Sequence, residues 1–306
     1  MNPGIYKDLS IEDYHKDKFL VSSTGLKQAV RSTRDFAFYL LEEQQQKTYF
    51  DFGNAFELAI MDEVNGTTLF KDEAAICKTA QWSKAALAEK PDLKTVKASK
   101  IYKELAKEFE AANFGKYLVP DTGPQSAESI ESMVKSCLEN DTVKRLLTGT
   151  EYQVSLVWED KQTGLKCKTR PDVCRTKKNV LVDIKTTIDA SPQGFARQAA
   201  KLDYPLQAVM QCIGAVETGL IDNVAAYYWL AVEKGEPFNF ALYEFQQDDL
   251  EYFTDAFHFY LKRCATAIDA ILKMDTPSFT KVPSYGENAD NKFGVLQLEI
   301  PLWYRK

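Results

Sequence analysis

The segment RPDVCRTKKNVLVDIKTT, residues 170–187, is the most informative part of the sequence. Its β-branched and apolar residues predict two short strands, and the turn-like TKKN between them predicts a hairpin. Asp172 lies in the first strand and Asp183 in the second, so pairing of the strands would bring the two carboxylates close together. Lys185 follows Asp183 by two residues and therefore points to the same face.

Charged side chains on the second strand are unusual because the residues around them, 180–182 and 184, are all apolar. A polar group on a buried strand needs a compensating interaction. Two carboxylates suit a hard divalent cation such as Mg²⁺, which prefers oxygen ligands, and a neighbouring lysine can orient the attacking water or stabilise developing charge. The alternative is an exposed Asp183–Lys185 ion pair on an ordinary strand.

A third acid, Glu57, lies in FDFGNAFELAI on a predicted helix that begins near Gly53. It is the only charged residue between Asp51 and Asp62, and its neighbours are mostly apolar. These neighbours favour a third metal ligand. The alternative is an exposed position on the helix surface.

The remaining chain is predicted to form helices first and a sheet later. Apolar periodicity predicts helices at 24–43, 55–62, 82–113 (broken at Pro91), 127–138 and 140–148, the last with Asn140 as its N-cap. Strands are expected at 154–158, 165–175, 179–186, 224–232 and 239–246, the first three as an antiparallel meander, with helices at 192–218 and 248–273 and a last apolar segment at 295–304. The expectation is an α/β (α+β) fold with a central mixed β-sheet flanked by helices. We expect one domain, 1–306, with a helical part at 1–148 and a sheet-containing catalytic core at 149–306.

The composition is that of a globular protein, with 306 residues, 45% hydrophobic and 27% charged. No apolar run is long enough to cross a membrane, and the N-terminus lacks the features of a signal peptide. The six cysteines form no CxxC pair, which predicts free thiols in a reducing cytoplasm. With two histidines, a His-based zinc site is not expected.

The net charge of −6 argues, taken alone, against a nucleic-acid partner, but the charge is unevenly distributed. Residues 161–187 hold eight basic and two acidic side chains, a local charge of +6. Residues 217–255 hold nine acidic side chains and one basic one, a local charge of −8. The positive segment contains the proposed metal-binding acids, and we therefore expect it to contact DNA. The alternative is that its lysines protect exposed strand edges.

An acid on a glycine-led helix, followed by Asp, about ten residues, and Asp-x-Lys, resembles the PD-(D/E)xK nuclease superfamily. The fuller similarity is to the RecE-type exonuclease domain (exonuclease VIII) of phages and prophages. It runs in order through PGIYKDLSIEDYH, VSSTGLKQAV, FDFGNAFE, WEDKQTGLKCKTRPD, VDIKTT and LEIPLW, and so spans most of the chain.

The resemblance implies a metal-dependent 5′→3′ exonuclease that acts on the ends of double-stranded DNA. Such enzymes form ring-like homo-oligomers and leave 3′ single strands for a single-strand annealing recombinase. By the same resemblance Asp172 and Asp183 bind Mg²⁺, with Mn²⁺ as a substitute, Lys185 is the catalytic lysine, and the backbone carbonyl of Ile184 faces the metal. Glu57 is expected to be a third metal ligand. A cytoplasmic location in a bacterial host cell, with a phage or prophage origin, is also implied.

Two positions differ from the RecE pattern. Glu57 replaces a histidine, although the related lambda-exonuclease branch has an acid there. In LDYPLQAVMQ, Tyr204 and Gln207 match the family's helix motif, but Gln211 replaces its tyrosine. Gln207 is expected to steady the site or the DNA. The alternative is that Tyr204 and Gln207 form a surface pair at a helix N-terminus.

Other residues are expected to position DNA or the site. Ser22, Thr24 and Lys27 belong to a family segment that can meet the DNA terminus, although a helix N-cap is the preferred interpretation of the hydroxyls. Arg170 and Thr186 flank the predicted acids. Neither an iron–sulfur cluster nor ATP is expected, because no four closely spaced cysteines and no P-loop motif occur.

The leading hypothesis is thus a Mg²⁺-dependent exonuclease that degrades linear duplex DNA for phage-type recombination by strand annealing. One alternative is a DNA-end-binding recombination accessory protein with impaired catalysis. Another is a structure-specific endonuclease that uses the same site.

Overall fold

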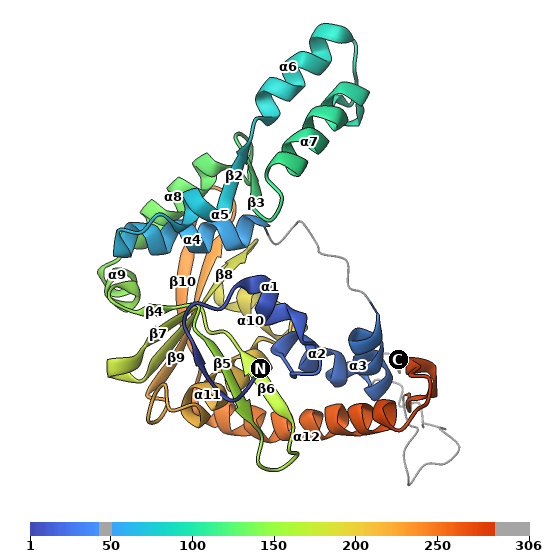
Figure 1. Cartoon of the computed structure of the whole chain (residues 1–306). Helices are drawn as coiled ribbons and strands as arrows, with labels where there is room; N and C mark the ends of the chain where they lie inside the picture. Colours follow the sequence, from blue (N-terminus) through green and yellow to red (C-terminus); the bar gives the residue numbers. More distant parts are fainter. Residues whose placement is uncertain (43–50, 285–306) are drawn as a thin grey trace, which may run out of the picture.

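The computed structural model describes residues 1–42 and 51–284, and Figure 1 shows their arrangement. Its helices are α1 (Ile11–Lys16), α2 (Ser23–Arg31), α3 (Thr33–Leu41), α4 (Asp51–Asn65), α5 (Leu69–Glu73), α6 (Thr79–Glu89), α7 (Lys100–Ala112), α8 (Ala127–Leu138), α9 (Asp141–Leu147), α10 (Pro192–Lys201), α11 (Tyr204–Glu217) and α12 (Gln247–Leu272). Its strands are β1 (Gly4–Tyr6), β2 (Ala74–Cys77), β3 (Tyr117–Pro120), β4 (Glu151–Tyr152), β5 (Ser155–Glu159), β6 (Lys166–Thr169), β7 (Val173–Arg175), β8 (Val180–Thr187), β9 (Ala226–Glu233) and β10 (Phe240–Glu244). The predicted apolar segment 295–304, with LEIPLW, lies outside the described residues.

A mixed sheet with strand order β10-β9-β8-β7-β4 forms the centre of the molecule. β8 and β9 are parallel, and the other neighbours are antiparallel. A parallel pair needs a crossover connection, which α10 and α11 provide between β8 and β9. The expected α/β fold with a central mixed sheet flanked by helices is therefore confirmed.

The two faces of this sheet bury two separate cores, because side chains alternate along each strand. On one face, Leu181 of β8 packs with residues of α2, α3, α11 and α12. On the other, Val182 and Ile184 pack with residues of α4, α8 and α9. Alternation places Asp183 and Lys185 on the same face as Leu181, toward α11. Among the described helices, none is both long and apolar enough to cross a membrane.

Two predicted helices are each divided in two. The helix expected at 24–43 breaks at Ser32, whose hydroxyl accepts a hydrogen bond from the amide of Asp35 at 2.9 Å and so caps α3. The helix expected at 192–218 breaks at Leu202 and Asp203, where Asp203 has a left-handed backbone (φ 52°) and Pro205 follows in the first turn of α11. In contrast, α8 has the predicted bounds, and Asn140 caps α9 as predicted.

The predicted antiparallel meander is wrong, although each of its hairpins forms. β5 and β6 pair with each other in a second sheet, of order β1-β5-β6, whereas β7 and β8 belong to the central sheet. The chain leaves one sheet for the other at Arg170–Asp172. Pro171 lies there, and proline cannot donate a hydrogen bond to a ladder.

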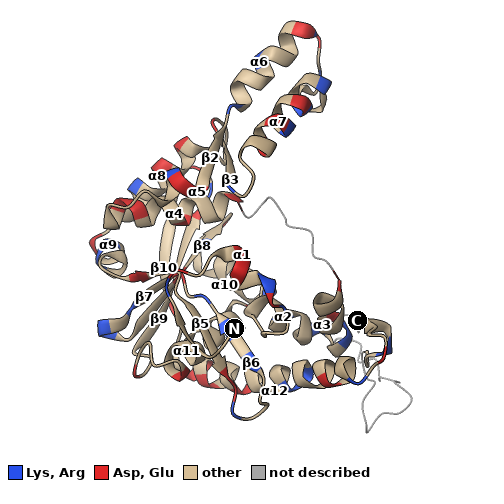
Figure 2. Cartoon of the chain, viewed as in Figure 1, with Lys and Arg blue, Asp and Glu red and all other residues tan. Residues whose placement is uncertain are grey.

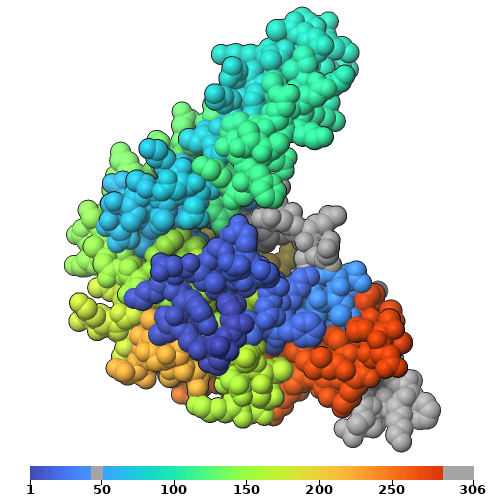
Figure 3. Space-filling model, viewed as in Figure 1, coloured from blue at the N-terminus to red at the C-terminus, as the bar shows by residue number. Residues whose placement is uncertain are grey.

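Residues 74–120 form a projecting arm that the sequence did not predict as a unit. β2 and β3 pair in parallel at its base, and α6 and α7 extend from them (Figure 1). Figure 3 shows the arm projecting from the rest of the surface. Its own small core includes Trp82 and Tyr102, whose rings contact edge to face at 5.6 Å between centroids. The first 148 residues, expected to be helical, thus contain the three strands β1, β2 and β3.

Candidate active site

The predicted acids meet at the point where β7 begins beside β8. The register Val173↔Val182 places Asp172 opposite Asp183 across the hairpin. Because β7 begins only at Val173, the amide of Ile184 lacks a strand partner there and donates instead to Asp172 Oδ2 at 2.7 Å. The amide and carbonyl of one strand residue point to the same strand edge, so the Ile184 carbonyl lies on the edge that Asp172 occupies.

Asp183 is fully buried and forms an ion pair with Lys185 through Oδ2. Its Oδ1 accepts hydrogen bonds from the side-chain amides of Gln207 at 3.1 Å and Gln211 at 3.3 Å. Oδ2 accepts no hydrogen bond of good geometry. The alternative of an exposed ion pair is therefore wrong, and among the described residues Lys185 is the only polar partner of this buried carboxylate oxygen.

Glu57 lies on α4 and is 8% exposed, so the alternative of a surface position is also wrong. Its Oε1 accepts hydrogen bonds from the Tyr152 hydroxyl at 3.1 Å and the Gln153 side chain at 2.8 Å. Gln153 has a left-handed backbone (φ 45°), and its amide donates to the carbonyl of Asp172 at 2.9 Å. A strained residue that links two functional segments is typical of active sites.

Burial and mutual repulsion determine the electrostatics of the three acids. Burial, followed by the charges of Glu57 and Asp183, raises the pKa of Asp172 well above its usual range. Burial also raises the pKa of Glu57, and the Asp183 charge adds to this. Burial alone would lower the pKa of Lys185, but the carboxylates of Asp183 and Asp172 outweigh it and raise that pKa. The Lys185 ammonium thus faces three neighbouring carboxyl groups in a buried site, an arrangement that favours binding of a cation.

Gln211, the residue that departs from the family motif, takes part in the site. Its carbonyl oxygen accepts a hydrogen bond from the Tyr227 hydroxyl at 2.7 Å, which fixes the side-chain amide so that its nitrogen points to Asp183. Tyr227 is on β9 and is 1% exposed. A tyrosine from the neighbouring strand therefore joins the hydrogen-bond network around Asp183.

Tyr204 and Gln207 connect a second lysine to the site, so the alternative of a surface pair is wrong. Lys27 of α2 donates to Gln207 Oε1 at 3.2 Å, while Gln207 donates in turn to Asp183. The ammonium groups of Lys27 and Lys185 lie 5.5 and 5.3 Å from the centre of the Tyr204 ring. Burial and then the Lys185 charge lower the pKa of Lys27 to about 8.

The remaining residues that were predicted to position DNA or the site make contacts that support the fold. Ser22 caps α2 by accepting from the amide of Gly25 at 3.3 Å, as preferred, and Thr24 lies in the first turn of that helix. Arg170 donates to the carbonyl of Leu9 at 3.2 Å and so holds the N-terminal segment. Thr186 Oγ1 lies 3.2 Å from where a Cβ on Gly53 would be, which shows how closely α4 approaches β8.

The positive segment 161–187 is divided between two sheets, and three of its basic side chains have partners within the protein. Its contact with DNA stays a prediction. Lys168 is buried and donates to the carbonyls of Tyr14 and Asp17, the latter at 2.7 Å. Arg175 is bound to backbone carbonyls, including that of Thr148, and Lys161 is paired with Glu217 at 2.8 Å. The charges are dispersed because the segment passes through two sheets.

Tyr152, Gln153 and Tyr227 were not predicted as site residues. Gln153 and Tyr227 lie 19 and 44 residues from the nearest predicted acid, Asp172 and Asp183 respectively, and no spacing rule connects them. Tyr227 does lie in VAAYYWLAV, where a hydroxyl on a buried strand needs a partner. That was the one available signal.

The donor set fits a hard divalent cation. Glu57, Asp172 and Asp183 supply carboxylate oxygens, and Asp183 Oδ2 is buried without a hydrogen bond. In the part of the chain that the structure describes, no three His, Cys, Asp or Glu side chains already form a metal-binding group. The ion pair between Lys185 and Asp183 accounts for part of this, and binding would require the ammonium to withdraw from that carboxylate.

The fold is that of a PD-(D/E)xK nuclease domain. Residues 22–272 match the model of the PDDEXK-like domain of unknown function (DUF3799), and the chain belongs to that family.

A solved structure supports the fold. The crystal structure of an Eubacterium rectale protein, provisionally assigned as an exonuclease, aligns with a TM-score of 0.56 and 11% identity over 97% of this chain and 98% of that one. A second solved structure, that of SSO0001, aligns with a TM-score of 0.28 and 14% identity over 77% and 90% of the two chains, too distantly to inform the fold. No curated protein matches the sequence.

Proposed function

We propose that this protein is a Mg²⁺-dependent 5′→3′ exonuclease that degrades linear double-stranded DNA. The observation that carries the proposal is the convergence of Glu57, Asp172 and Asp183 with Lys185 in one buried cluster. Family membership and the arrangement of α4, β7 and β8 support it.

In phosphodiester hydrolysis the three acids, Lys185 and the two glutamines would have different tasks. Glu57, Asp172 and Asp183 would hold the divalent cation, with the Ile184 carbonyl as a further oxygen ligand. The bound metal would supply positive charge to the scissile phosphate and lower the pKa of a coordinated water. Lys185 would orient the attacking water. It would also stabilise the charge on the phosphate as the water oxygen bonds to phosphorus and the P–O bond to the leaving group breaks. Gln207 and Gln211 hold Asp183 in place through hydrogen bonds to Oδ1.

The central test uses Asp183→Asn and Lys185→Met, which preserve side-chain size. Each substitution is expected to reduce degradation of linear duplex DNA by at least roughly 10²-fold, because each removes a group that acts on the reacting atoms. Release of label from 5′-labelled and 3′-labelled duplex, with and without Mg²⁺, measures the rate and the polarity. Lys161→Ala is the matched control, since Lys161 is exposed and paired with Glu217. Wild-type rates in both site variants would contradict the proposal.

A second candidate function is a DNA-end-binding recombination accessory protein with impaired catalysis. It is favoured by the ion pair between Lys185 and Asp183 and by the absence of a ready metal-binding group among residues 1–42 and 51–284. Calorimetric titration with Mg²⁺ or Mn²⁺ separates the two functions. Binding that Asp183→Asn abolishes supports the nuclease, whereas no binding by the wild-type protein supports the accessory role.

The assembly and the pathway are further parts of the proposal. By resemblance to the RecE type, the chain would form a homo-oligomeric ring and pass 3′ single strands to an annealing recombinase. Light scattering after size exclusion measures the oligomeric state. Circular duplex DNA tests the alternative of a structure-specific endonuclease, because an exonuclease requires an end and would leave a closed circle intact.

A further inference from the structure

The arm, residues 74–120, is positively charged in an otherwise acidic protein. It contains nine lysines and five acidic residues, a net charge of +4, so the rest of the chain carries −10 to give the total of −6. The excess is concentrated at the outer end, where residues 84–103 hold six lysines and two acids. Figure 2 shows these charges on a lobe that stands apart from the main body.

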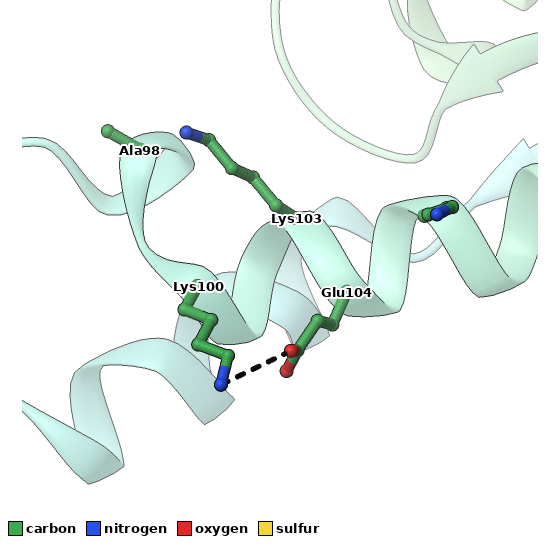
Figure 4. Close-up of a pocket in the computed structure, with 5 residues that line it drawn as sticks. Ala98, Lys100, Lys103 and Glu104 are labelled. Atoms are coloured by element: carbon green, nitrogen blue, oxygen red, sulfur yellow. Dashed lines mark ion pairs between the residues drawn. The ribbon is translucent and has the colours of Figure 1, made fainter.

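The lysines of the arm face solvent and are largely unpaired. All nine are exposed: Lys78, Lys84, Lys90, Lys94, Lys97, Lys100, Lys103, Lys107 and Lys116. Within the described chain, Lys100 is the only one of them in an ion pair, with Glu104 at 3.7 Å. Lys100, Lys103 and Lys107 line a shallow hollow of about 370 Å³ on α7 together with Ala98 and Glu104 (Figure 4).

The arm has its own hydrophobic core and is hydrogen-bonded at its base to α4, the helix that carries Glu57. Its inner face packs around Trp82, whose ring also contacts Phe109 at 5.5 Å. At the base, Asp121 accepts from the amide of Ala80 at 3.2 Å. The amide of Leu118 in β3 donates to Asp51 Oδ2 at 3.3 Å, and Asp51 begins α4, the helix that carries Glu57.

The base of the arm also lies within electrostatic range of the site. Burial raises the pKa of Tyr117, the first residue of β3, to about 12, and the charges of Glu73 and then Glu57 add to this effect. The lysines at the outer end are therefore carried on a fixed support that starts beside the candidate active site.

We propose that the arm is a contact surface for the phosphate backbone of duplex DNA. It would contact the stretch of duplex that lies several base pairs away from the end being degraded. The inference rests on the proposed nuclease function. A four-residue strand followed by a helix of 11 to 13 residues extends about 30 Å, the length of roughly nine base pairs. Exposed lysines along such a length can contact several successive phosphates, and such contacts carry no sequence preference.

The test compares the salt dependence of DNA binding by two matched variants. Lys94→Gln, Lys97→Gln and Lys103→Gln together neutralise the outer arm, and Lys262→Gln, Lys273→Gln and Lys281→Gln neutralise three exposed lysines elsewhere. Fluorescence anisotropy in metal-free buffer, which prevents cleavage, measures binding to a 30-base-pair duplex and to a hairpin with a five-base-pair stem. Circular dichroism confirms that each variant is folded.

On the long duplex, the arm variant is expected to bind more weakly than the wild type and to reduce the slope of log K against log[salt] by about two to three, one for each lost phosphate contact. The short stem is about 17 Å long and so ends before the outer lysines of the arm, and the slopes should coincide there. Equal slopes for wild type and arm variant on the long duplex, or an equal loss in the control variant, would overturn the inference. If the wild type degrades duplex DNA while the arm variant keeps its slope, the arm inference alone fails. If the wild type neither binds nor degrades it, the proposed function fails as well.

Discussion

At the scale of single residues, the site depends on how Asp183 is held. Gln207 and Gln211 both donate to its Oδ1, which leaves Oδ2 to Lys185. Each glutamine is oriented by a further partner, Lys27 for Gln207 and Tyr227 for Gln211. An amide can present either its nitrogen or its oxygen, and these outer hydrogen bonds select the nitrogen.

Tyr227→Phe tests this control of Gln211. The substitution removes the hydrogen bond to Gln211 Oε1 and leaves a buried acceptor without its tyrosine partner, which is expected to lower the free energy of unfolding by about 1–3 kcal/mol. Because outer partners position metal ligands, Mg²⁺ affinity should fall roughly 10-fold or more. Chemical denaturation and metal titration measure the two effects. Tyr243→Phe, which removes a hydroxyl that donates to the Ala190 carbonyl, is the control for a lost hydroxyl away from Asp183. Equal Mg²⁺ affinity in the wild type and Tyr227→Phe would contradict the role of Tyr227.

Some site residues could be predicted from the sequence because they are close to one another along the chain, whereas others come together only in the folded protein. The approach of Asp172, Asp183 and Lys185 to one another could be predicted because these charged residues lie on, or directly before, the short apolar strands of one hairpin. The partners of these residues could not, because Tyr152, Gln153 and Tyr227 approach only through tertiary packing. The left-handed backbone of Gln153 leaves no mark in the sequence, since it is not a glycine.

At the scale of elements, a glycine allows α11 to approach the second sheet closely, because it has no side chain at the contact. A Cβ on Gly214 would lie 2.7 Å from Trp158 and 2.8 Å from Thr169, on β5 and β6. This close approach fixes the position of the helix that carries Gln207 and Gln211. The same helix was predicted as part of one longer helix, because apolar periodicity does not show the change of direction at Asp203.

Gly214→Ala is therefore expected to destabilise the protein, although alanine favours helix by about 1 kcal/mol over glycine. Overpacking against Trp158 and Thr169 should outweigh that gain and lower the free energy of unfolding by about 1–3 kcal/mol. Urea denaturation measures the change. A variant more stable than the wild type would show that α11 can shift away without cost.

The N-terminal helix α1 is held to β6 by the buried ammonium of Lys168, which donates to the carbonyls of Tyr14 and Asp17. Burial lowers the pKa of Lys168 to about 8. Between this value and the usual pKa of about 10.4, the unfolded chain binds the proton more strongly, so this residue makes stability rise with pH across that range.

Lys168→Met removes this pH dependence. The stability of the wild type relative to the variant is expected to increase by up to about 3 kcal/mol between pH 7 and pH 10.5. The difference between the two proteins is the relevant quantity, because buried tyrosines and cysteines remote from Lys168 titrate at high pH in both proteins. Urea denaturation at several pH values measures it. A difference that stays constant with pH would contradict the assignment.

At the scale of the whole molecule, the charges are arranged by fold rather than by sequence segment. The positive segment 161–187 is divided between two sheets. Several of its basic side chains donate hydrogen bonds to backbone carbonyls. The arm, in contrast, gathers a smaller excess on one projecting lobe (Figure 2). The fold class was predictable because hydrophobic periodicity and the hairpin are local features. The arm as a unit was not, because its two parallel strands are separated by 39 residues, from Lys78 to Lys116.

The parallel pairing of β2 and β3 has a consequence for how this protein can change over evolutionary time. The pairing brings the two ends of the arm together, with Ala74 beside Tyr117, and most contacts of α6 and α7 are with each other. The segment between the strands can therefore be lengthened, shortened or replaced with little effect on the sheet that carries the acids. Insertions and deletions among relatives should accumulate there, and a relative with a different arm would keep the same chemistry on a different length of duplex.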